Sequence, residues 1–336
     1  MKKVSLITGG AGFIGSHVAK QCLEMNHEVI ILDDLSGGFV DNIPNGAKFI
    51  EGSINNNNLL YRIFSEYNID YVYHLAAYAA EGLSHFIRSF NYENNLMGSI
   101  NLINLAVKFK VKAFVFTSSI AVYGHLQPPF DEDTIPAPAD PYAISKYAVE
   151  LDLKAAKSMW PDFNYIIFRP HNVFGENQNI GDKYRNVIGI FMNQIMQDQP
   201  LTIFGDGNQT RAFSYIDDVA IPIAKSVDIK EAYNEIFNIG ADTPYTVNSL
   251  VNFIGEAFNK TPKVKYLAAR NEAVHAYSNH DKAKQVFGEP TGISIVDGIK
   301  KMAEWAKKVG ARESQEFSNI EIYENLPDSW KQIIKL

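Results

Sequence analysis

The sequence predicts an α/β protein with a doubly wound parallel sheet, followed by a smaller C-terminal substrate-binding lobe. Short apolar runs alternate with stretches of helical length through the first half of the chain, which indicates crossover connections and helices on both faces of one sheet. A glycine-rich turn directly follows the first apolar run. After about Arg169 the sequence changes to longer loops rich in glycine and asparagine, which favours a second lobe that completes a ligand site.

The apolar runs and the change of pattern define the expected elements and lobes. We expect the sheet domain over residues 1–170, rejoined by about 212–240, because Asp217 and Asp218 can cap a helix that returns to it. The substrate-binding lobe is expected over residues 171–310, discontinuous in sequence, and residues 311–336 form an extension to which we assign no role. The predicted strands are Val4 to Thr8, Val29 to Leu32, Lys48 to Glu51, Tyr71 to Leu75, Phe114 to Thr117 and Tyr165 to Phe168.

The composition is that of a globular protein without a nucleic-acid or membrane partner. Hydrophobic residues make up 46% of the 336 residues and charged residues 21%, which excludes disorder. The net charge of -7 argues against a surface that neutralises nucleic-acid phosphates. No apolar run has the length of a membrane span, no signal peptide follows Met1, and Cys22 is the single cysteine, so we expect a cytoplasmic protein. The histidines show no metal-ligand spacing, and we expect no metal.

The glycine-rich turn spans residues 8–15, between the first predicted strand and a helical pattern. In this setting Gly9 permits a tight turn, Gly12 lets the backbone approach a pyrophosphate, and Gly15 allows close packing of the helix on the strand. Asp33 ends the next strand, eighteen residues beyond Gly15, where a carboxylate can accept hydrogen bonds from ribose hydroxyls and repel a 2′-phosphate. This Rossmann-type pattern predicts NAD as the cofactor. The alternative for Asp33 is a turn residue before Leu35.

A second motif combines Tyr142 and Lys146, which lie four residues apart on one face of a helix that Asp140 caps. A phenol is a poor base at neutral pH unless a nearby cation stabilises the phenolate, and Lys146 with the positive nicotinamide ring can supply that charge. Ser118 and Ser119 end the preceding strand, and strand ends face the crevice where such sheets bind ligands. A serine there can pass a proton between a substrate hydroxyl and the phenolate. Taken alone, the Tyr142/Lys146 pair could equally mark an exposed helix face.

The glycine-rich turn, the strand-end serines followed by Val122-Tyr123-Gly124, and the Tyr142/Lys146 pair together resemble the extended short-chain dehydrogenase/reductase enzymes that act on nucleotide sugars. The resemblance runs from residue 3 to about residue 310. Residues 74–77 are similar to the family's segment that lines the nicotinamide pocket. The cofactor contacts it implies are Gly9, Gly12, Phe13, Ile14, Gly15, Asp33, Asp34, Leu35, Ser36, Ser53, Ile54, Leu75, Ala76, Ala77, Asn94, Thr117, Tyr142, Lys146, Arg169 and Pro170.

The resemblance also implies a diphosphate clamp. Arg211 matches the arginine that grips the diphosphate, Arg270 matches the second arginine of the clamp, and Asn172 matches an asparagine donor. Ala276 aligns with the residue that gates N-acetylated sugars, and its small side chain leaves room, whereas a shift by one residue would put Tyr277 there and close the pocket. The implied substrate contacts are Tyr78, Ser118, Ser119, Tyr142, Asn172, Thr202, Phe204, Arg211, Arg270 and Ala276.

The residues that follow the strand-end serines narrow the reaction. Relatives that act as 4,6-dehydratases carry an Asp-Glu pair there, and UDP-glucuronate decarboxylases carry a glutamate, whereas this chain has Ile120 and Ala121. The GDP-mannose 3,5-epimerases use a cysteine where Ala121 stands. The remaining catalytic set, Ser119, Tyr142 and Lys146, is what NAD-dependent epimerisation at C4 through a transient 4-keto sugar needs. We therefore expect an isomerase that acts on UDP-glucose and UDP-galactose or on a UDP-N-acetylhexosamine.

Departures from the family leave alternatives open. Ser53 stands where the family has an acidic residue near the adenine, and residues 78–85 are closer to the loop of the GDP-mannose 3,5-epimerases than to that of most epimerases. The alternatives are a UDP-glucuronate 4-epimerase, a GDP-mannose 3,5-epimerase-like enzyme, a 4-ketoreductase and a non-catalytic nucleotide-sugar-binding protein. The resemblance also implies a homodimer that uses the helix at residues 91–109, although its apolar residues would suit an internal core helix equally.

Overall fold

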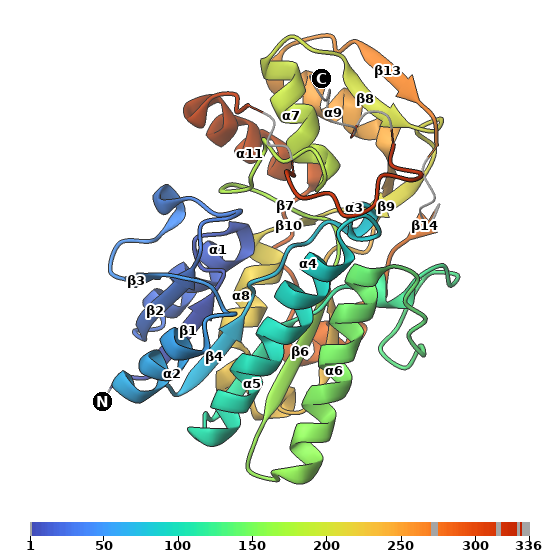
Figure 1. Ribbon diagram of the computed structural model, residues 1–336. Coiled ribbons are helices and arrows are strands. Elements are labelled where there is room, and N and C mark those ends of the chain that lie inside the picture. The colour runs from blue at the N-terminus through green and yellow to red at the C-terminus, as the bar shows by residue number, and fades with distance from the viewer. Residues whose placement is uncertain (1, 270–274, 314–316, 328–329, 331–336) are drawn as a thin grey trace.

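The computed structural model of the protein describes residues 2–269, 275–313, 317–327 and 330. Within these residues, seven parallel strands form a central sheet in the order β11-β6-β5-β4-β1-β2-β3, with helices on both faces (Figure 1). The expected doubly wound α/β class is therefore confirmed. The strand order reverses between β1 and β4, and such sheets bind ligands outside the carboxyl ends of the strands at that reversal. The strands are β1 (Val4–Thr8), β2 (Glu28–Asp33), β3 (Lys48–Glu51), β4 (Tyr71–His74), β5 (Ala113–Thr117), β6 (Tyr165–Pro170) and β11 (Ile236–Ile239).

Alternate residues of the strands fill two separate cores, because successive side chains point to opposite faces of a sheet. In β1, Ile7 belongs to the core that includes Val18 of α1, whereas the neighbouring Leu6 belongs to the core that includes Leu102 of α5. Both faces of a parallel sheet are covered, which explains the near-continuous apolar runs in the sequence. The helices of this part are α1 (Phe13–Glu24) and α8 (Asp217–Lys225) on the first face, and α2 (Asn57–Glu66), α4 (Arg88–Tyr92), a π-helical turn (Glu93–Met97), α5 (Gly98–Lys108) and α6 (Pro141–Met159) on the second.

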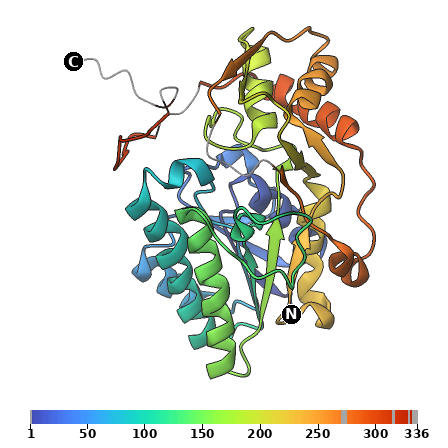
Figure 2. The same ribbon diagram turned by 90° about the vertical axis from the view of Figure 1, so that its right-hand side faces the viewer.

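The second lobe lies beyond the carboxyl ends of the sheet strands (Figures 1 and 2). Its small sheets pair segments that are distant in sequence: β8 pairs with β13, β7 with β10, and β9 lies between β12 and β14. Three helices pack around these strands. The elements are β7 (Val173–Phe174), α7 (Val187–Met196), β8 (Leu201–Phe204), β9 (Thr210–Ala212), β10 (Ser214–Tyr215), β12 (Pro244–Thr246), α9 (Val247–Phe258), β13 (Val264–Leu267), β14 (His275–Ala276) and α11 (Ile295–Val309).

Parts of the second half of the chain return to the central sheet. Helix α8 packs on α1, and β11 extends the sheet beside β6. Helix α10 (Asp281–Phe287), which the sequence analysis placed in the substrate-binding lobe, also packs on β11, so that part of the lobe boundary was wrong. The reason is an aromatic contact, because the Phe287 ring lies 4.9 Å from that of Phe237 and 5.6 Å from that of Phe168, centroid to centroid. Of the helices in the described residues, none is long and apolar enough to cross a membrane.

Candidate active site

The turn between β1 and α1 leaves no room for side chains at two of its glycines. Gly9 has a φ of +72°, and a Cβ there would lie 2.7 Å from the Ala76 nitrogen. A Cβ at Gly15 would lie 2.1 Å from the Gly9 carbonyl oxygen. Helix α1 begins after Gly12 without a side-chain cap, so its N-terminus presents backbone N–H groups to an anion. The turn therefore has the shape and the donors of a pyrophosphate cradle.

Asp33, at the end of β2, braces this cradle. Its carboxylate accepts hydrogen bonds from the Ala11 nitrogen at 3.0 Å and from the Leu35 nitrogen at 2.8 Å. Burial raises the pKa of Asp33 above its ordinary value, and the two backbone donors act in the opposite direction. Asp33 thus acts as a turn residue, as the alternative held, and also borders the cavity where a ribose would lie.

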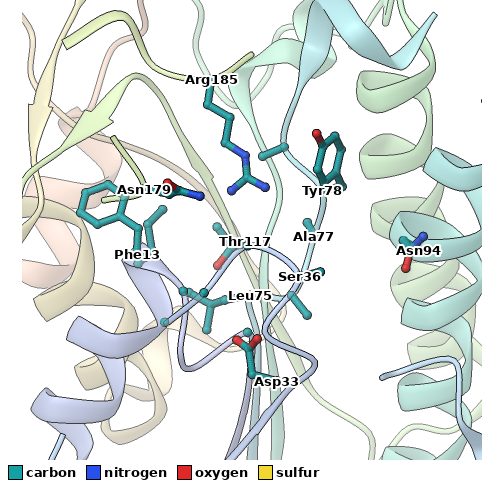
Figure 3. Close-up of a pocket in the computed structure, with 18 of the residues that line it drawn as sticks. Phe13, Asp33, Ser36, Leu75, Ala77, Tyr78, Asn94, Thr117, Asn179 and Arg185 are labelled. Atoms are coloured by element: carbon teal, nitrogen blue, oxygen red, sulfur yellow. The ribbon is translucent and has the colours of Figure 1, made fainter. Parts of the chain in front are cut away.

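A cavity of about 320 Å³ lies over the carboxyl ends of the strands and brings together most of the predicted cofactor residues (Figure 3). The Thr117 hydroxyl and the Gln178 amide oxygen line it and have no hydrogen-bond partner in the described part of the chain. Buried polar atoms of this kind fit a polar ligand such as NAD. The predicted residues that line the cavity are Gly9, Gly12, Phe13, Ile14, Gly15, Asp33, Asp34, Ser36, Ile54, Leu75, Ala76, Ala77, Tyr78, Asn94, Thr117, Ser118, Ser119, Tyr142, Lys146, Pro170 and Asn172.

Tyr142 and Lys146 lie at the start of α6, on the face that turns toward this cavity. Asp140 caps the helix, because its carboxylate accepts a hydrogen bond from the Ala143 nitrogen at 2.9 Å. Both side chains are buried, and Lys146 Nζ donates to the Thr117 carbonyl oxygen at 2.8 Å. Lys146 Nζ lies 5.9 Å from the centroid of the Tyr142 ring. The exposed-face alternative for this pair is therefore excluded.

Burial disfavours the charged form of both Tyr142 and Lys146. It lowers the pKa of Lys146 to about 7, and the nearby Glu150 carboxylate acts in the opposite direction. Burial raises the pKa of Tyr142 well above its ordinary value, while a hydrogen bond with Ser119 lowers it. A further positive charge beside the phenol would favour the phenolate. A cation bound beside Tyr142 would therefore lower the pKa of its hydroxyl.

Arg169 was expected to contact the cofactor, and the structure corrects this expectation. Its side chain is 1% exposed and forms a bidentate ion pair with Glu150, at 2.9 Å from Nε and 2.5 Å from Nη2. Its Nη1 donates to the Tyr123 hydroxyl at 2.7 Å. Ser118 Oγ donates to the same Glu150 carboxylate at 2.5 Å, so this hydroxyl is directed away from a substrate although the residue borders the cavity. Arg169 and Ser118 are parts of a buried polar network behind Lys146.

Two other predicted cofactor residues do not line the cavity. Ser53 Oγ accepts a hydrogen bond from the Asn55 nitrogen at 3.1 Å, and its neighbours Gly52 and Ile54 face the cavity in its place. Leu35 has a φ of +59°, and Asp34 and Ser36 on either side of it face the cavity. At both positions the neighbouring residues line the cavity instead of the predicted one.

Of the predicted substrate residues of the second lobe, Asn172 lines the cavity, whereas Thr202, Phe204, Arg211 and Ala276 do not. Thr202 is held by Gln194, whose amide donates to Oγ1 at 2.9 Å. Phe204 ends β8, and Arg211 lies on β9 directly beside Ala276 of β14. The structure thus brings the predicted clamp arginine next to the predicted gate. Arg270 lies outside the described residues, and Tyr277 also does not border the cavity.

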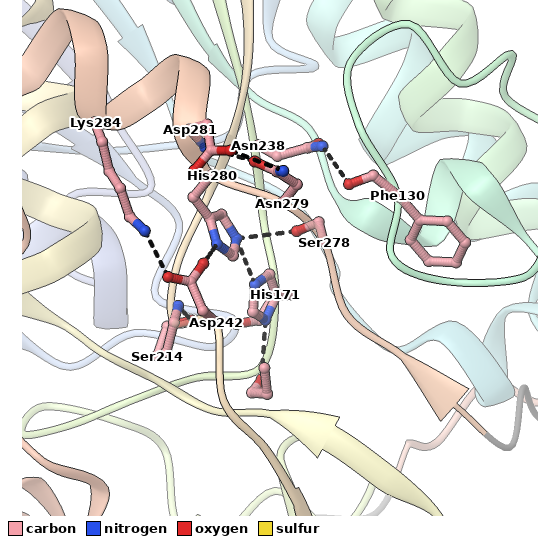
Figure 4. A network of polar contacts seen from close by, with 12 residues as sticks. Phe130, His171, Ser214, Asn238, Asp242, Ser278, Asn279, His280, Asp281 and Lys284 are labelled. Carbon is pink, nitrogen blue, oxygen red and sulfur yellow. Dashed lines mark hydrogen bonds and ion pairs between the residues drawn. The ribbon is translucent and has the colours of Figure 1, made fainter.

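A buried histidine pair connects the gate segment to the end of β6 (Figure 4). His171 and His280 face each other with their Nε2 atoms 2.9 Å apart, and His280 Nδ1 donates to Asp242 at 2.6 Å. His171 precedes Asn172, which lines the cavity, and His280 follows the strand that carries Ala276. This network holds the segment that follows Ala276 beside the end of β6, where Asn172 lines the cavity.

The sequence analysis missed cavity residues contributed by the loop before α7. Asn179 and Arg185 both point into the cavity (Figure 3). Arg185 forms an ion pair with Asp182 at 2.8 Å, and its guanidinium lies 5.1 Å from the centroid of the Tyr78 ring. The asparagine-rich composition of this loop was the only signal available. In the part of the chain that the structure describes, no group of three or more His, Cys, Asp or Glu side chains is placed to hold a metal.

The chain is similar in sequence and in structure to known proteins. The family described as "NAD dependent epimerase/dehydratase family" matches residues 5–240. A "Putative UDP-glucose 4-epimerase" of Methanocaldococcus jannaschii is 35% identical over 311 residues, which cover 90% of this chain and 98% of that protein. The crystal structure of a UDP-glucose 4-epimerase with UDP-glucose from Thermotoga maritima superposes with a TM-score of 0.87 at 33% identity, covering 91% of this chain and 99% of that one. A Thermus thermophilus UDP-glucose 4-epimerase in complex with NAD gives a TM-score of 0.85 at 28% identity, covering 90% and 99%.

Proposed function

Because the chain belongs to the NAD-dependent epimerase/dehydratase family, we propose that it inverts C4 of a UDP-linked sugar through a transient 4-keto intermediate. UDP-glucose and UDP-galactose, or a UDP-N-acetylhexosamine, are the proposed substrates. The relatives that act on UDP-sugars and the arrangement of Ser119, Tyr142 and Lys146 support this proposal. NAD, the cofactor of the family, suits the glycine cradle and Asp33.

The observation that carries the proposal is where the carboxylates of the cavity lie. Among the described residues that line it, Asp33 and Asp34 are the carboxylates; Asp33 ends β2 and Asp34 follows it, in the cofactor half. Elimination of water or loss of carbon dioxide would need further groups beside the sugar. Ile120, which is buried, and Ala121 stand next to Ser119 instead. Proton transfer by Tyr142 together with hydride transfer at one carbon is what the remaining groups support.

Each residue of the proposed catalytic set has a distinct task. When bound, NAD supplies the acceptor and then the donor of the hydride at C4. Tyr142 takes the proton of the C4 hydroxyl and returns it after the 4-keto sugar has turned its other face. Ser119, which hydrogen-bonds Tyr142, passes or orients that proton, and Lys146, fixed by the Thr117 carbonyl, favours the phenolate. Burial of the tyrosine and lysine keeps water from the transferred proton.

The proposal is tested by incubating the purified protein and NAD with UDP-glucose, UDP-galactose, UDP-N-acetylglucosamine and UDP-glucuronate in turn. Proton NMR of the product sugars is expected to show an equilibrium mixture of two C4 epimers for at least one pair. No lasting absorbance of reduced nicotinamide should accumulate, because the hydride returns to the sugar. A dehydrated or decarboxylated product, net reduction of NAD, or bound NAD without conversion of any sugar would each contradict the proposal.

A uronic acid is the second candidate substrate, because Arg185 brings a cation into the cavity. A guanidinium pairs well with a carboxylate, which UDP-glucuronate carries on its sugar and UDP-glucose lacks. The same incubation distinguishes the two, since conversion of UDP-glucuronate alone would favour the acidic sugar.

The choice of cofactor gives a specific prediction for Asp33. Replacement Asp33→Ser is expected to shift the ratio of the NADP and NAD dissociation constants by about tenfold or more toward NADP, because charge-assisted hydrogen bonds contribute about 1.5–3 kcal/mol and the repulsion of a 2′-phosphate is removed. Calorimetric titration with each dinucleotide measures that ratio. Asp41→Asn, at an exposed carboxylate nearby, is the matched control and should leave it unchanged. An unchanged ratio in Asp33→Ser would mean that Asp33 acts only as a brace of the turn.

We also propose a homodimer that pairs helices α5 and α6 of two subunits. The apolar residues Ile144 and Leu151 are 41% and 48% exposed on one side of α6, and Met97 is 53% exposed just before α5. Other residues of α5, such as Leu102 and Ile103, fill the internal core, so the helix serves both purposes. Leu151→Glu is expected to convert dimers to monomers in sedimentation velocity, because it buries a charge in the interface. Lys225→Glu, on the opposite face of the sheet, is the control; a monomeric wild type would reject the dimer.

We also propose that the protein resides in the cytoplasm. Cys22 is a free and buried thiol in the core between the sheet and α1, and burial raises its pKa to about 12. A buried thiol with a raised pKa is unreactive. It is compatible with a reducing compartment but does not depend on one. Fractionation of cells that produce the protein tests its location directly.

A further inference from the structure

The C-terminal extension, to which the sequence analysis assigned no role, lies against the segment that follows β4. Figure 1 shows the red C-terminal segment crossing α3 (Glu81–Ser84) at the junction of the two lobes. The extension shares a small apolar core with this segment, separate from the two cores of the sheet. Leu326 and Trp330 are each 3% exposed there, and the Trp330 ring lies 5.2 Å from that of Tyr184, centroid to centroid. The extension is therefore packed onto the molecule.

Glu321 fastens the extension to the first turn of α4. Its carboxylate accepts hydrogen bonds from the Ser89 nitrogen and the Phe90 nitrogen, each at 2.9 Å. Its own backbone nitrogen donates to the Phe86 carbonyl oxygen at 2.8 Å. A carboxylate in this position satisfies donors that the helix leaves unpaired. The extension thus has a defined register on α4.

Phe317 brings the extension to the wall of the active-site cavity. Its ring lies 5.3 Å from the Tyr78 ring and 4.9 Å from the Phe90 ring, centroid to centroid, and both Tyr78 and Phe90 line the cavity. The Tyr78 and Phe90 rings also meet each other edge to face at 5.3 Å. With Arg185 on another side of Tyr78, the phenol ring is held by three neighbours, and one of them belongs to the extension.

The backbone of Tyr78 is fixed independently of Phe317. The Tyr78 nitrogen donates to Asn95 Oδ1 at 2.8 Å, and Asn95 Nδ2 donates back to the Tyr78 carbonyl oxygen at 3.1 Å. Loss of the Phe317 ring would therefore remove one of the three contacts of the Tyr78 ring and leave its backbone in place. The wall of the cavity would change its shape at Tyr78 while the glycine cradle keeps its position.

This wall lies close to the reacting end of the cavity. Asn91 Nδ2 donates to the Pro141 carbonyl oxygen at 2.9 Å, and Ser84 Oγ donates to Asp140 at 3.3 Å, so the segment after β4 touches the start of α6 beside Tyr142. The relatives compared above are matched over 98–99% of their length while about a tenth of this chain stays outside the match.

We propose that Phe317 is a specificity-determining residue: through the ring of Tyr78 it sets the shape of the sugar end of the cavity, and so which substituents on the sugar are accepted. The substrate class rests on the function proposed above. Phe317 is a positioning residue, because it acts on the sugar through Tyr78. An apolar wall of this kind discriminates by about 10–200-fold between sugars that differ in bulk.

The test uses the full-length, NAD-loaded protein and measures binding by calorimetry with UDP, UDP-glucose and UDP-N-acetylglucosamine. Phe317→Ala is expected to change the ratio of the dissociation constants of the two UDP-sugars by about tenfold and to leave the affinity for UDP within about twofold. Phe317→Tyr, which keeps a ring, should restore the wild-type ratio. Ile322→Ala, at a 39% exposed position of the same segment, is the matched control and should match the wild type.

An unchanged ratio in Phe317→Ala, or an equal loss of affinity for UDP and both sugars, would overturn the proposal. If the alanine variant does not fold, the same ratio is measured in Phe317→Leu, which keeps most of the side-chain volume without the ring. Binding does not depend on conversion, so a wild type that binds both sugars and converts neither would refute the epimerase function alone. Turnover with an unchanged ratio in the variant would refute the role of Phe317 alone.

Discussion

Replacement of Tyr142 by phenylalanine is expected to lower kcat of the proposed epimerisation by about 10³-fold, within the range of about 10²–10⁴ that a positioned acid–base group contributes. The variant keeps the buried ring and loses the hydroxyl that would exchange the proton of the sugar. Lys146 remains hydrogen-bonded to the Thr117 carbonyl oxygen, so the site should stay folded. The change is measured as the initial rate of C4 inversion on NAD-loaded protein, with the dissociation constant of NAD determined in parallel.

The matched control is Tyr147→Phe, which removes a hydroxyl from a tyrosine five residues further along α6. Tyr147 packs against the apolar cluster around Val122 and does not line the cavity. Its loss should change the rate by less than about threefold, as most substitutions away from the chemistry do. If Tyr142→Phe retained more than a tenth of the wild-type rate with unchanged affinity for NAD, another group would have to act as the base, and the proposed role of Tyr142 would be wrong.

The sequence predicted the sheet and the position of the Tyr142/Lys146 pair beside the cavity, because both depend on local patterns. Buried parallel strands are apolar on both faces, and each of the six predicted strands lies within two residues of an observed one. The carboxyl ends of such strands meet at one edge of the sheet. This alone predicts that Ser119 and Lys146 lie near Gly9, although the sequence shows no contact between them. Strand β11 was not predicted, because four residues between polar loops give little pattern.

The predictions failed where the direction of one side chain decides the role. Neighbours on a strand point to opposite sides, and so Pro170 lines the cavity while the guanidinium of Arg169 turns to Glu150. Ser118 and Ser119, which follow β5, both border the cavity, but the Ser118 hydroxyl donates to Glu150. Contacts between segments that are distant in sequence could not be predicted either. Arg185, from a loop of the second lobe, and Phe317, from the C-terminal extension, both contact Tyr78, and no sequence pattern near them indicates this.

The buried pair Glu150–Arg169 gives the largest expected effect on stability. Both side chains are almost fully buried, at 0% and 2% exposure, and Glu150 also accepts from Ser118. Glu150→Gln is expected to lower the free energy of unfolding by about 3–5 kcal/mol, because the Arg169 charge is left uncompensated in the core. Denaturant unfolding followed by circular dichroism measures this loss. Glu235→Gln, in the exposed pair with Lys282, is the matched control and should cost less than about 1 kcal/mol.

The same substitution should also change the dependence of activity on pH, since Glu150 lies one helical turn beyond Lys146 and raises the pKa of its ammonium group. That pKa, about 7 in the protein, should fall further in Glu150→Gln, so the charged lysine would be lost at a lower pH. The alkaline fall of kcat is therefore expected to move to lower pH in the variant.

The double variant Glu150→Gln/Arg169→Gln should lose less stability than the sum of the two single changes, because each single change leaves an unmatched partner. Additive losses, or a loss in Glu150→Gln as small as in Glu235→Gln, would mean that the buried pair does not hold the floor of the site together.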